Sequence, residues 1–132
     1  MSWRRLFRGL LAIFFVGAGA NHFRALEFYR AMMPPWLPWP VALIYLSGIA
    51  EIMGGLGVLV PAARRAAGWG LIVLLVAIFP ANLHLALHHV ALPGTNLPDW
   101  VMWLRLPLQA VFMAWVWWTT LAPAPAGARP AS

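Results

Sequence analysis

The sequence predicts an all-α, polytopic membrane protein: a bundle of four transmembrane helices with both termini in the cytoplasm. Three observations predict this fold class: an excess of apolar residues, four apolar segments of membrane-spanning length, and the placement of the arginines. Of the 132 residues, 63% are hydrophobic and 9% are charged, and the mean hydropathy is +0.78. A soluble domain is about 45–50% apolar and about 25% charged, so the composition argues against a water-soluble globule.

Four apolar segments are long enough to cross a bilayer, whose core needs about 20 helical residues. They cover residues 6–22, 41–60, 66–89 and 100–121. Each contains glycine, proline or a polar residue, which membrane helices tolerate where neighbouring helices satisfy the backbone. The apolar residues do not alternate as they do in transmembrane strands, so these segments are expected to be helices.

The remaining residues are expected at the membrane surface. Residues 23–40 form an interfacial segment, in which residues 23–33 are expected to fold as a short amphipathic helix. The proline-rich end of this segment cannot continue as a helix. Residues 1–122 therefore form a single membrane domain, and residues 123–132, rich in alanine, proline and glycine, are expected to be a disordered tail.

The charged residues predict the orientation in the membrane. Nine basic and three acidic residues give a net charge of +6, and positive charge concentrates in cytoplasmic loops. In a four-span arrangement one side carries Arg4, Arg5, Arg8, Arg64, Arg65 and Arg129, and the other carries Arg24 and Arg30. Both termini are therefore expected in the cytoplasm. Because the arginines are dispersed among apolar segments, nucleic acid is not an expected partner, and the lipid bilayer is.

The N-terminus has a second interpretation. Basic residues, an apolar run and the small residues Ala18-Gly19-Ala20 are also typical of a secretory signal peptide, whose cleavage would leave three spans. We expect the segment to be retained, because the arginines support an even number of spans.

Glu51 is the clearest candidate functional residue, because an ionisable side chain within a span costs about 2.5–3.5 kcal/mol. It lies about ten residues, or about 15 Å, into its segment, close to the bilayer midplane. Small residues that share its face by helical periodicity are Ser47, Gly48, Gly54 and Gly55. Such residues let another helix pack closely, so Glu51 is expected to point into the bundle.

Four other polar residues are expected in the outer half of the bundle with Glu51: His22, Asn82, Arg105 and Gln109. Arg105 and Gln109 share a helix face because they are four residues apart. Asn82 follows Pro80, which leaves the Val76 carbonyl without its helical donor. These residues therefore predict an internal polar cluster or ligand pocket. A purely structural interpretation stays open, in which Glu51 and Arg105 form a buried ion pair that sets the helix register.

No metal site is expected. His84 and His88 share a helix face, but two histidines without carboxylate or thiolate company fall short of a usual ligand set. The chain contains no cysteine, which excludes disulfides, thiolate metal sites and iron–sulfur clusters. Nucleotide-binding and hydrolase motifs such as the P-loop and the nucleophile elbow are absent, and no catalytic residue is predicted.

Several short motifs, in this order and spacing, resemble the DoxX-like membrane proteins. They are His22-Phe23, the Pro-Pro-Trp-Leu-Pro run at 34–38, Ser-Gly-Ile-Ala-Glu-Ile-Met-Gly-Gly at 47–55, Arg64-Arg65, Phe-Pro-Ala-Asn at 79–82 and Leu-Arg-Leu-Pro-Leu-Gln at 104–109. The resemblance covers residues 9–118. It implies a four-helix bundle in the bacterial cytoplasmic (inner) membrane.

The resemblance also carries expectations about function. The family takes its name from a subunit of a thiosulfate–quinone oxidoreductase, and other members look like partners of thiol-stress or superoxide-defence proteins. Distant relatives resemble assembly chaperones for membrane receptors. By resemblance, Glu51, Asn82, Arg105 and Gln109 line a shared internal site. The lack of cysteine argues against a protein-thiol sulfur relay in this chain.

Three functions remain as hypotheses. The favoured one is a non-enzymatic scaffold or assembly/accessory subunit with a protein partner in the membrane, because no redox group is encoded. The second is a quinone-binding accessory subunit of a membrane oxidoreductase, in which Arg105, Gln109, Asn82 and His22 bind the quinone oxygens and Glu51 delivers protons. The third is a small proton-coupled transporter built around Glu51, although a permanently charged Arg105 beside it would hold Glu51 ionised.

Overall fold

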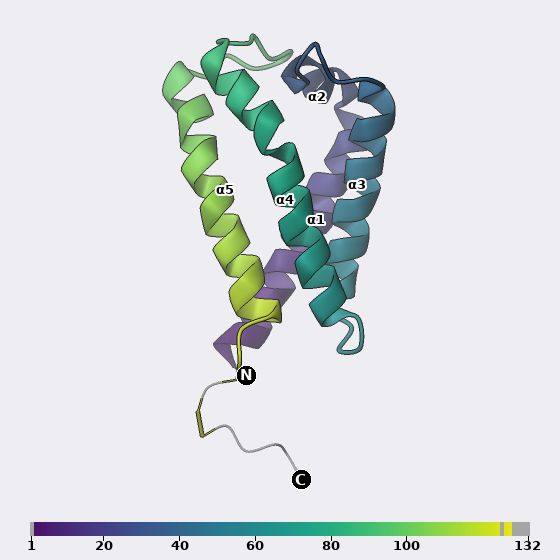
Figure 1. The fold of residues 1–132 in the computed structure, drawn as a ribbon, viewed down its shortest axis with the longest axis vertical. Helices are drawn as coiled ribbons and strands as arrows, with labels where there is room; N and C mark the ends of the chain where they lie inside the picture. The colour runs from purple at the N-terminus through teal and green to yellow at the C-terminus, as the bar shows by residue number, and fades with distance from the viewer. Residues whose placement is uncertain (1, 125, 128–132) are drawn as a thin grey trace.

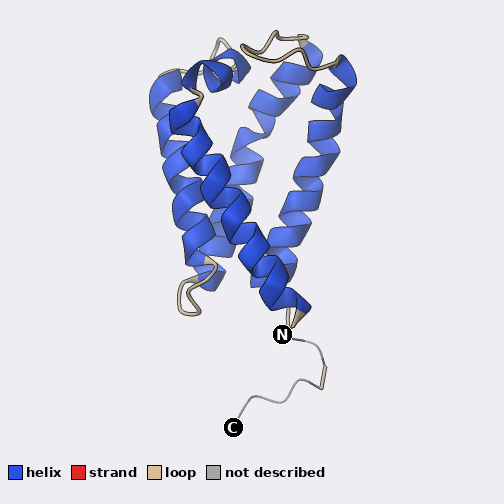
Figure 2. Ribbon diagram, turned by 180° about the vertical axis from the view of Figure 1, so that it is seen from behind, coloured by secondary structure: helices blue, strands red, loops and turns tan. Residues whose placement is uncertain are grey.

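The structure is a computed structural model that describes residues 2–124, 126 and 127. It contains five helices in chain order: α1 (Trp3–Arg24), α2 (Leu26–Met32), α3 (Pro40–Gly57), α4 (Arg64–Leu87) and α5 (Asp99–Thr120) (Figure 1). No strand occurs among these described residues, so the all-α prediction is confirmed (Figure 2). Much of the predicted tail, residues 125 and 128–132, lies outside the described part of the chain.

Three of the long helices, α1, α3 and α4, have the length and apolar composition needed to cross a membrane. Their outward faces carry large apolar side chains, and Ile13, Met53 and Val73 are each at least 65% exposed. Such surfaces are stable in lipid rather than in water. The chain is therefore a membrane protein. Helix α5 is equally long, with 22 residues, but it contains Asp99 and Arg105 and is less apolar.

The observed helix boundaries differ from the predicted ones by a few residues. Helix α1 continues to Arg24, two residues beyond its predicted end, and α3 ends at Gly57, three residues early. The short helix expected within residues 23–33 is present as α2, but it covers only part of that range. The proline-rich stretch after it is not helical, and α3 begins at Pro40 directly after Trp39, whose φ of 50° breaks any helix.

The four long helices form an up-down-up-down bundle (Figures 1 and 2). Helix α1 packs against α3 and α5, and α4 packs against the same two helices. Helix α2 covers one end of the bundle and contacts α1, α3 and α4. At the other end, the beginning of α1 meets the end of α5, where Arg8 Nη2 donates to the Thr119 carbonyl at 2.8 Å.

Glycine brings α1 and α3 into close contact. A Cβ atom added to Gly19 would lie 2.5 Å from the Gly48 carbonyl oxygen, and one added to Gly48 would lie 2.9 Å from the Gly19 oxygen. Gly55 packs farther along the same interface, whereas Gly54 faces Leu71 of α4. Three of the four predicted small packing residues therefore lie at helix interfaces. Ser47 differs, because it faces an internal cavity.

Two apolar clusters stabilise the two ends of the bundle. The larger contains Leu11, Ala12, Phe15, Val58, Leu71, Leu75 and Val116. The smaller lies under α2 and contains Met32, Leu85, Ala86, Leu92 and Met102. Phe15 and Leu75 of the first cluster and Met32 of the second all line the cavity. The cavity therefore lies between the two clusters.

Candidate functional site

A cavity of about 700 Å³ lies between the helices and is lined by residues of all five of them. It is partly open to the outer surface, where Phe14 and Leu46 of its lining are exposed. All five residues of the predicted polar cluster line it: His22, Glu51, Asn82, Arg105 and Gln109. Among the residues that the structure describes, Tyr29 and Ser47 are the only other polar ones in its lining, and the rest are apolar. The fold thus brings the predicted residues to one mostly apolar cavity, to which several helices each contribute one or a few polar groups.

Glu51 pairs with His22 and not with Arg105, so the ion pair of the purely structural interpretation does not form. Glu51 Oε2 lies 3.1 Å from His22 Nε2, and the two side chains are 8% and 9% exposed. The reason is the order of the helices around the bundle. Helix α3 packs directly on α1, which carries His22, but makes no comparable contact with α5, which carries Arg105.

Hydrogen-bonding groups at α3 hold the His22 ring in place. His22 Nδ1 lies 3.0 Å from the Ile44 carbonyl oxygen and 3.1 Å from Ser47 Oγ, and Ser47 itself donates to the same carbonyl at 2.9 Å. A carbonyl oxygen only accepts, so a hydrogen bond from the ring to Ile44 requires the tautomer with a hydrogen on Nδ1. The other ring nitrogen, Nε2, faces the Glu51 carboxylate. The pair therefore places two groups that can each carry a proton side by side at the cavity wall.

Asn82, Gln109 and Arg105 form a second group on α4 and α5. Asn82 Nδ2 donates to Gln109 Oε1 at 2.9 Å, and Gln109 Nε2 donates to the Leu75 carbonyl. Arg105 Nη2 lies 3.4 Å from Asn82 Oδ1 and 3.9 Å from the Met32 sulfur. From Pro80, the sequence predicted that the Val76 carbonyl lacks its helical donor. In the structure the Gln109 side chain donates to the carbonyl one residue earlier, that of Leu75.

Arg105 faces the cavity without an anionic partner. Among the described residues, its side chain makes no ion pair, and both of its hydrogen-bond partners are neutral. Nor does any described hydrogen bond or ion pair join this group to the His22–Glu51 pair on the opposite wall. A guanidinium has five N–H donors. The cavity therefore contains a cation with most of its hydrogen-bonding capacity unused.

Tyr29 of α2 also belongs to the site, although the sequence reasoning did not select it. Its ring lies 4.1 Å from that of His22, and its hydroxyl accepts a hydrogen bond from Asn21 Nδ2 at 3.0 Å. Burial raises the pKa of the Tyr29 phenol above its ordinary value, so the hydroxyl keeps its proton and can donate it to a guest. Only the folding of α2 over the bundle brings Tyr29 to the cavity, and no periodic pattern signals it.

The remaining histidines lie outside the cavity. The rings of His84 and His88 are 4.3 Å apart, and His89 Nδ1 lies 3.2 Å from Asp99 Oδ2. Within the described part of the chain, no group of three histidine, aspartate or glutamate side chains is arranged to hold a metal ion.

Comparison with known proteins assigns the chain to a family. Residues 11–120 match the family described as a domain of unknown function, DUF8561. The chain belongs to the DUF8561 family. No curated protein and no solved structure matches the chain significantly. The DUF8561 region contains every residue that lines the cavity, so the candidate site lies wholly within the family domain. The resemblance to DoxX-like proteins stays a prediction.

Proposed function

We propose that this DUF8561 protein spans the bacterial cytoplasmic membrane four times and binds an isoprenoid quinone in its cavity, as an accessory subunit of a membrane oxidoreductase. One observation carries the proposal: Arg105, which has no anionic partner among the described residues, and the close His22–Glu51 pair face the same apolar cavity from opposite walls. A quinone has an apolar ring and tail, with oxygens that accept hydrogen bonds on two sides of the ring.

The dimensions and lining of the cavity support this ligand class. Its volume, about 700 Å³, falls in the usual range of about 300–1,000 Å³ for small-molecule sites. Apolar side chains such as Phe14 and Phe112 suit the ring and tail. Arg105 and the Tyr29 hydroxyl are the donors left free for the quinone oxygens, and His22 and Glu51 are two groups nearby that can transfer a proton.

The geometry revises the roles expected for Asn82 and Gln109. Each uses its amide hydrogens on a protein acceptor, Gln109 Oε1 and the Leu75 carbonyl. They therefore act as positioning residues, which hold Arg105 through Asn82 Oδ1 rather than binding the quinone themselves.

Removal of the Arg105 charge tests the proposal. We expect Arg105→Gln to weaken quinone binding about tenfold to hundredfold, since a hydrogen bond to a charged group contributes about 1.5–3 kcal/mol. Native mass spectrometry of the purified full-length protein, titrated with ubiquinone and with menaquinone, measures the bound fraction. The control is Arg30→Gln, which removes an exposed arginine that pairs with Glu27 outside the cavity.

Two results would point elsewhere. Quinone binding that is absent in the wild type, together with a stoichiometric polypeptide after crosslinking in membranes, would favour the scaffold or assembly function. Glu51-dependent flux of a solute in proteoliposomes, driven by a pH gradient, would favour the transporter.

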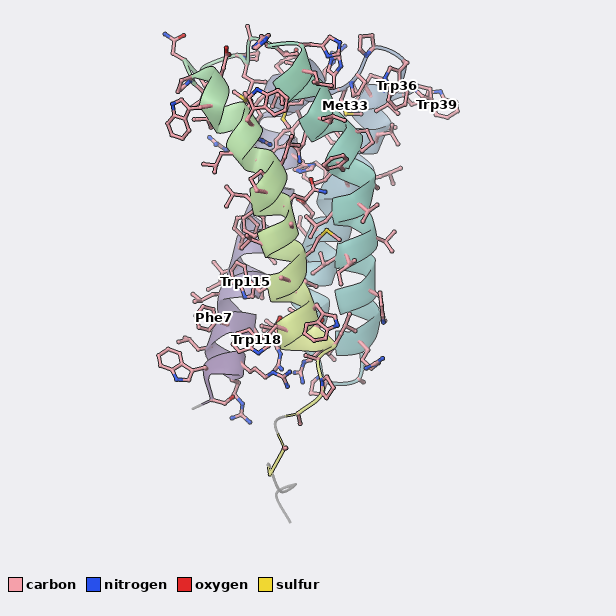
Figure 3. All side chains as sticks on the ribbon, turned by 60° about the vertical axis from the view of Figure 1, so that its left-hand side comes forward. Phe7, Met33, Trp36, Trp39, Trp115 and Trp118 are labelled. Carbon is pink, nitrogen blue, oxygen red and sulfur yellow. The ribbon has the colours of Figure 1, made fainter. Side chains whose placement is uncertain are left out.

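The proposed topology makes α5 the fourth span and places both termini in the cytoplasm. Tryptophans at both ends of the bundle support the fourth span, because indoles prefer membrane interfaces, and the arginines support the orientation. Phe7, Trp115 and Trp118 lie near the end of α5, and Trp36 and Trp39 lie near the opposite end (Figure 3).

The absence of cysteine makes this topology easy to test. A single cysteine at Ala62, between α3 and α4, is expected to react with a membrane-impermeant maleimide only after the cells are permeabilised. A cysteine at Asn96, between α4 and α5, is expected to react in intact spheroplasts. Labelling of both positions from the outside would contradict four spans with cytoplasmic termini.

A further inference from the structure

A cluster of arginines without any acidic residue occupies the end of the bundle where α1 and α4 begin. It consists of Arg4, Arg5, Arg8, Arg64 and Arg65. Arg64, Arg4 and Arg5 all lie close enough to Arg8 to repel its guanidinium. The three acidic residues of the chain are elsewhere: Glu27 in α2, Glu51 in the cavity and Asp99 at the start of α5. We call this group the basic cluster.

Only part of the basic cluster has a structural role. Arg8 and Arg4 donate to the carbonyls of Thr119 and Ala122 at the end of α5. Arg64 donates to the Val58 carbonyl at the end of α3, at 2.9 Å. These bonds satisfy carbonyls that lack helical partners. These hydrogen bonds do not neutralise the arginines, because a backbone carbonyl carries only a partial negative charge.

Arg5 and Arg65 have no such role. Both are exposed, and within the described residues neither side chain makes a hydrogen bond or ion pair. They stand in the first turns of α1 and α4, where positive charge opposes the helix dipole. Helices α2 and α5 show the opposite arrangement, with Glu27 and Asp99 in their first turns. Arg5 and Arg65 therefore do not stabilise the helices in which they lie.

The depth of the basic cluster indicates its ligand. Trp115 and Trp118 lie at the same end of the molecule (Figure 3), where indoles mark the level of the lipid head groups. Trp3, 71% exposed, belongs to the same end. The arginines thus lie at the depth of the lipid phosphates. Anionic lipids attract basic residues at this level, by about 1 kcal/mol for each arginine.

We propose that the basic cluster binds the phosphate of an anionic phospholipid, with Arg5 and Arg65 as the residues that select a negatively charged lipid over a zwitterionic one. This site is separate from the cavity, at the opposite end from α2, and does not depend on the proposed quinone function.

The test uses the full-length protein in mild detergent and native mass spectrometry with added phosphatidylglycerol or phosphatidylcholine. Wild-type protein is expected to retain phosphatidylglycerol in preference to phosphatidylcholine. The double variant Arg5→Gln/Arg65→Gln is expected to lower phosphatidylglycerol retention about thirtyfold, since two arginines at about 1 kcal/mol each are lost. The matched control Arg24→Gln/Arg30→Gln removes the same charge from the other end and is expected to leave retention unchanged.

Three results would overturn the proposal. Equal retention of the two lipids by wild-type protein would show that charge is not recognised. An equal loss in both double variants would show a general effect of net charge. Inorganic phosphate and soluble glycerophosphoglycerol are each added as competitors of phosphatidylglycerol. If inorganic phosphate displaces the lipid to the same extent as glycerophosphoglycerol, the cluster binds free phosphate rather than a lipid. Because Arg5 and Arg65 make no internal hydrogen bond, the test variant is expected to fold, and a thermal melt checks this.

Discussion

Replacing Gly19 by valine is expected to destabilise the bundle by about 3 kcal/mol, at the upper end of the usual cost of overpacking. A Cβ atom at this position would lie 2.5 Å from the Gly48 carbonyl oxygen and 2.7 Å from Ile52 Cγ1. The first of these neighbours is backbone and cannot rotate away, so α1 and α3 would have to separate. Unfolding of the purified protein in increasing SDS, followed by circular dichroism, measures the change.

Gly17 provides the matched control, because it lies in the same helix and an added Cβ would meet nothing within 4 Å. Gly17→Val is expected to leave stability within about 0.5 kcal/mol of the wild type, as for other surface substitutions. A similar loss in both variants would mean that helix propensity, rather than the close approach of α1 and α3, governs the effect.

The second large effect is expected from His22→Leu. Removal of one partner from a buried charged pair costs about 3–5 kcal/mol, because the other partner stays buried without compensation. Here the stranded group is Glu51, whose Oε2 lies 3.1 Å from His22 Nε2 and has no hydrogen-bond partner among the described atoms. The same unfolding assay measures the loss. His88→Leu serves as a control, since His88 is exposed and lies outside the cavity.

A double-mutant cycle separates pairing from simple loss of packing. If His22 and Glu51 share a proton, Glu51→Leu should restore a large part of the stability lost in His22→Leu, because both polar groups are then gone. Additive losses would mean that the two side chains act independently, and that the short contact between them contributes nothing.

Much of the fold could be predicted from local properties of the chain. Hydropathy and helical periodicity placed the long helices within a few residues, because a segment that crosses lipid must be apolar and must satisfy its own backbone. The same periodicity put Gly48 and Gly55 on the face of Glu51, and both pack on α1 in the structure. Depth is also a local property, since each residue adds about 1.5 Å along a helix. Residues at similar depth, such as Asn82 and Arg105, were therefore expected to converge in the outer half of the bundle with Glu51.

The partners of these residues were decided only by the tertiary structure. Depth along a helix says nothing about which helix is adjacent, so a Glu51–Arg105 pair stayed open from the sequence, whereas the packing of α3 on α1 pairs Glu51 with His22. Arg105 is thereby left facing the cavity without an anion. Tyr29 reaches the same cavity because α2 folds across the end of the bundle. The sequence by itself determined the helices, their apolar faces and the depth of the polar side chains. The order of the helices around the bundle decided which of those side chains meet, because that order depends on long-range packing that no local pattern records.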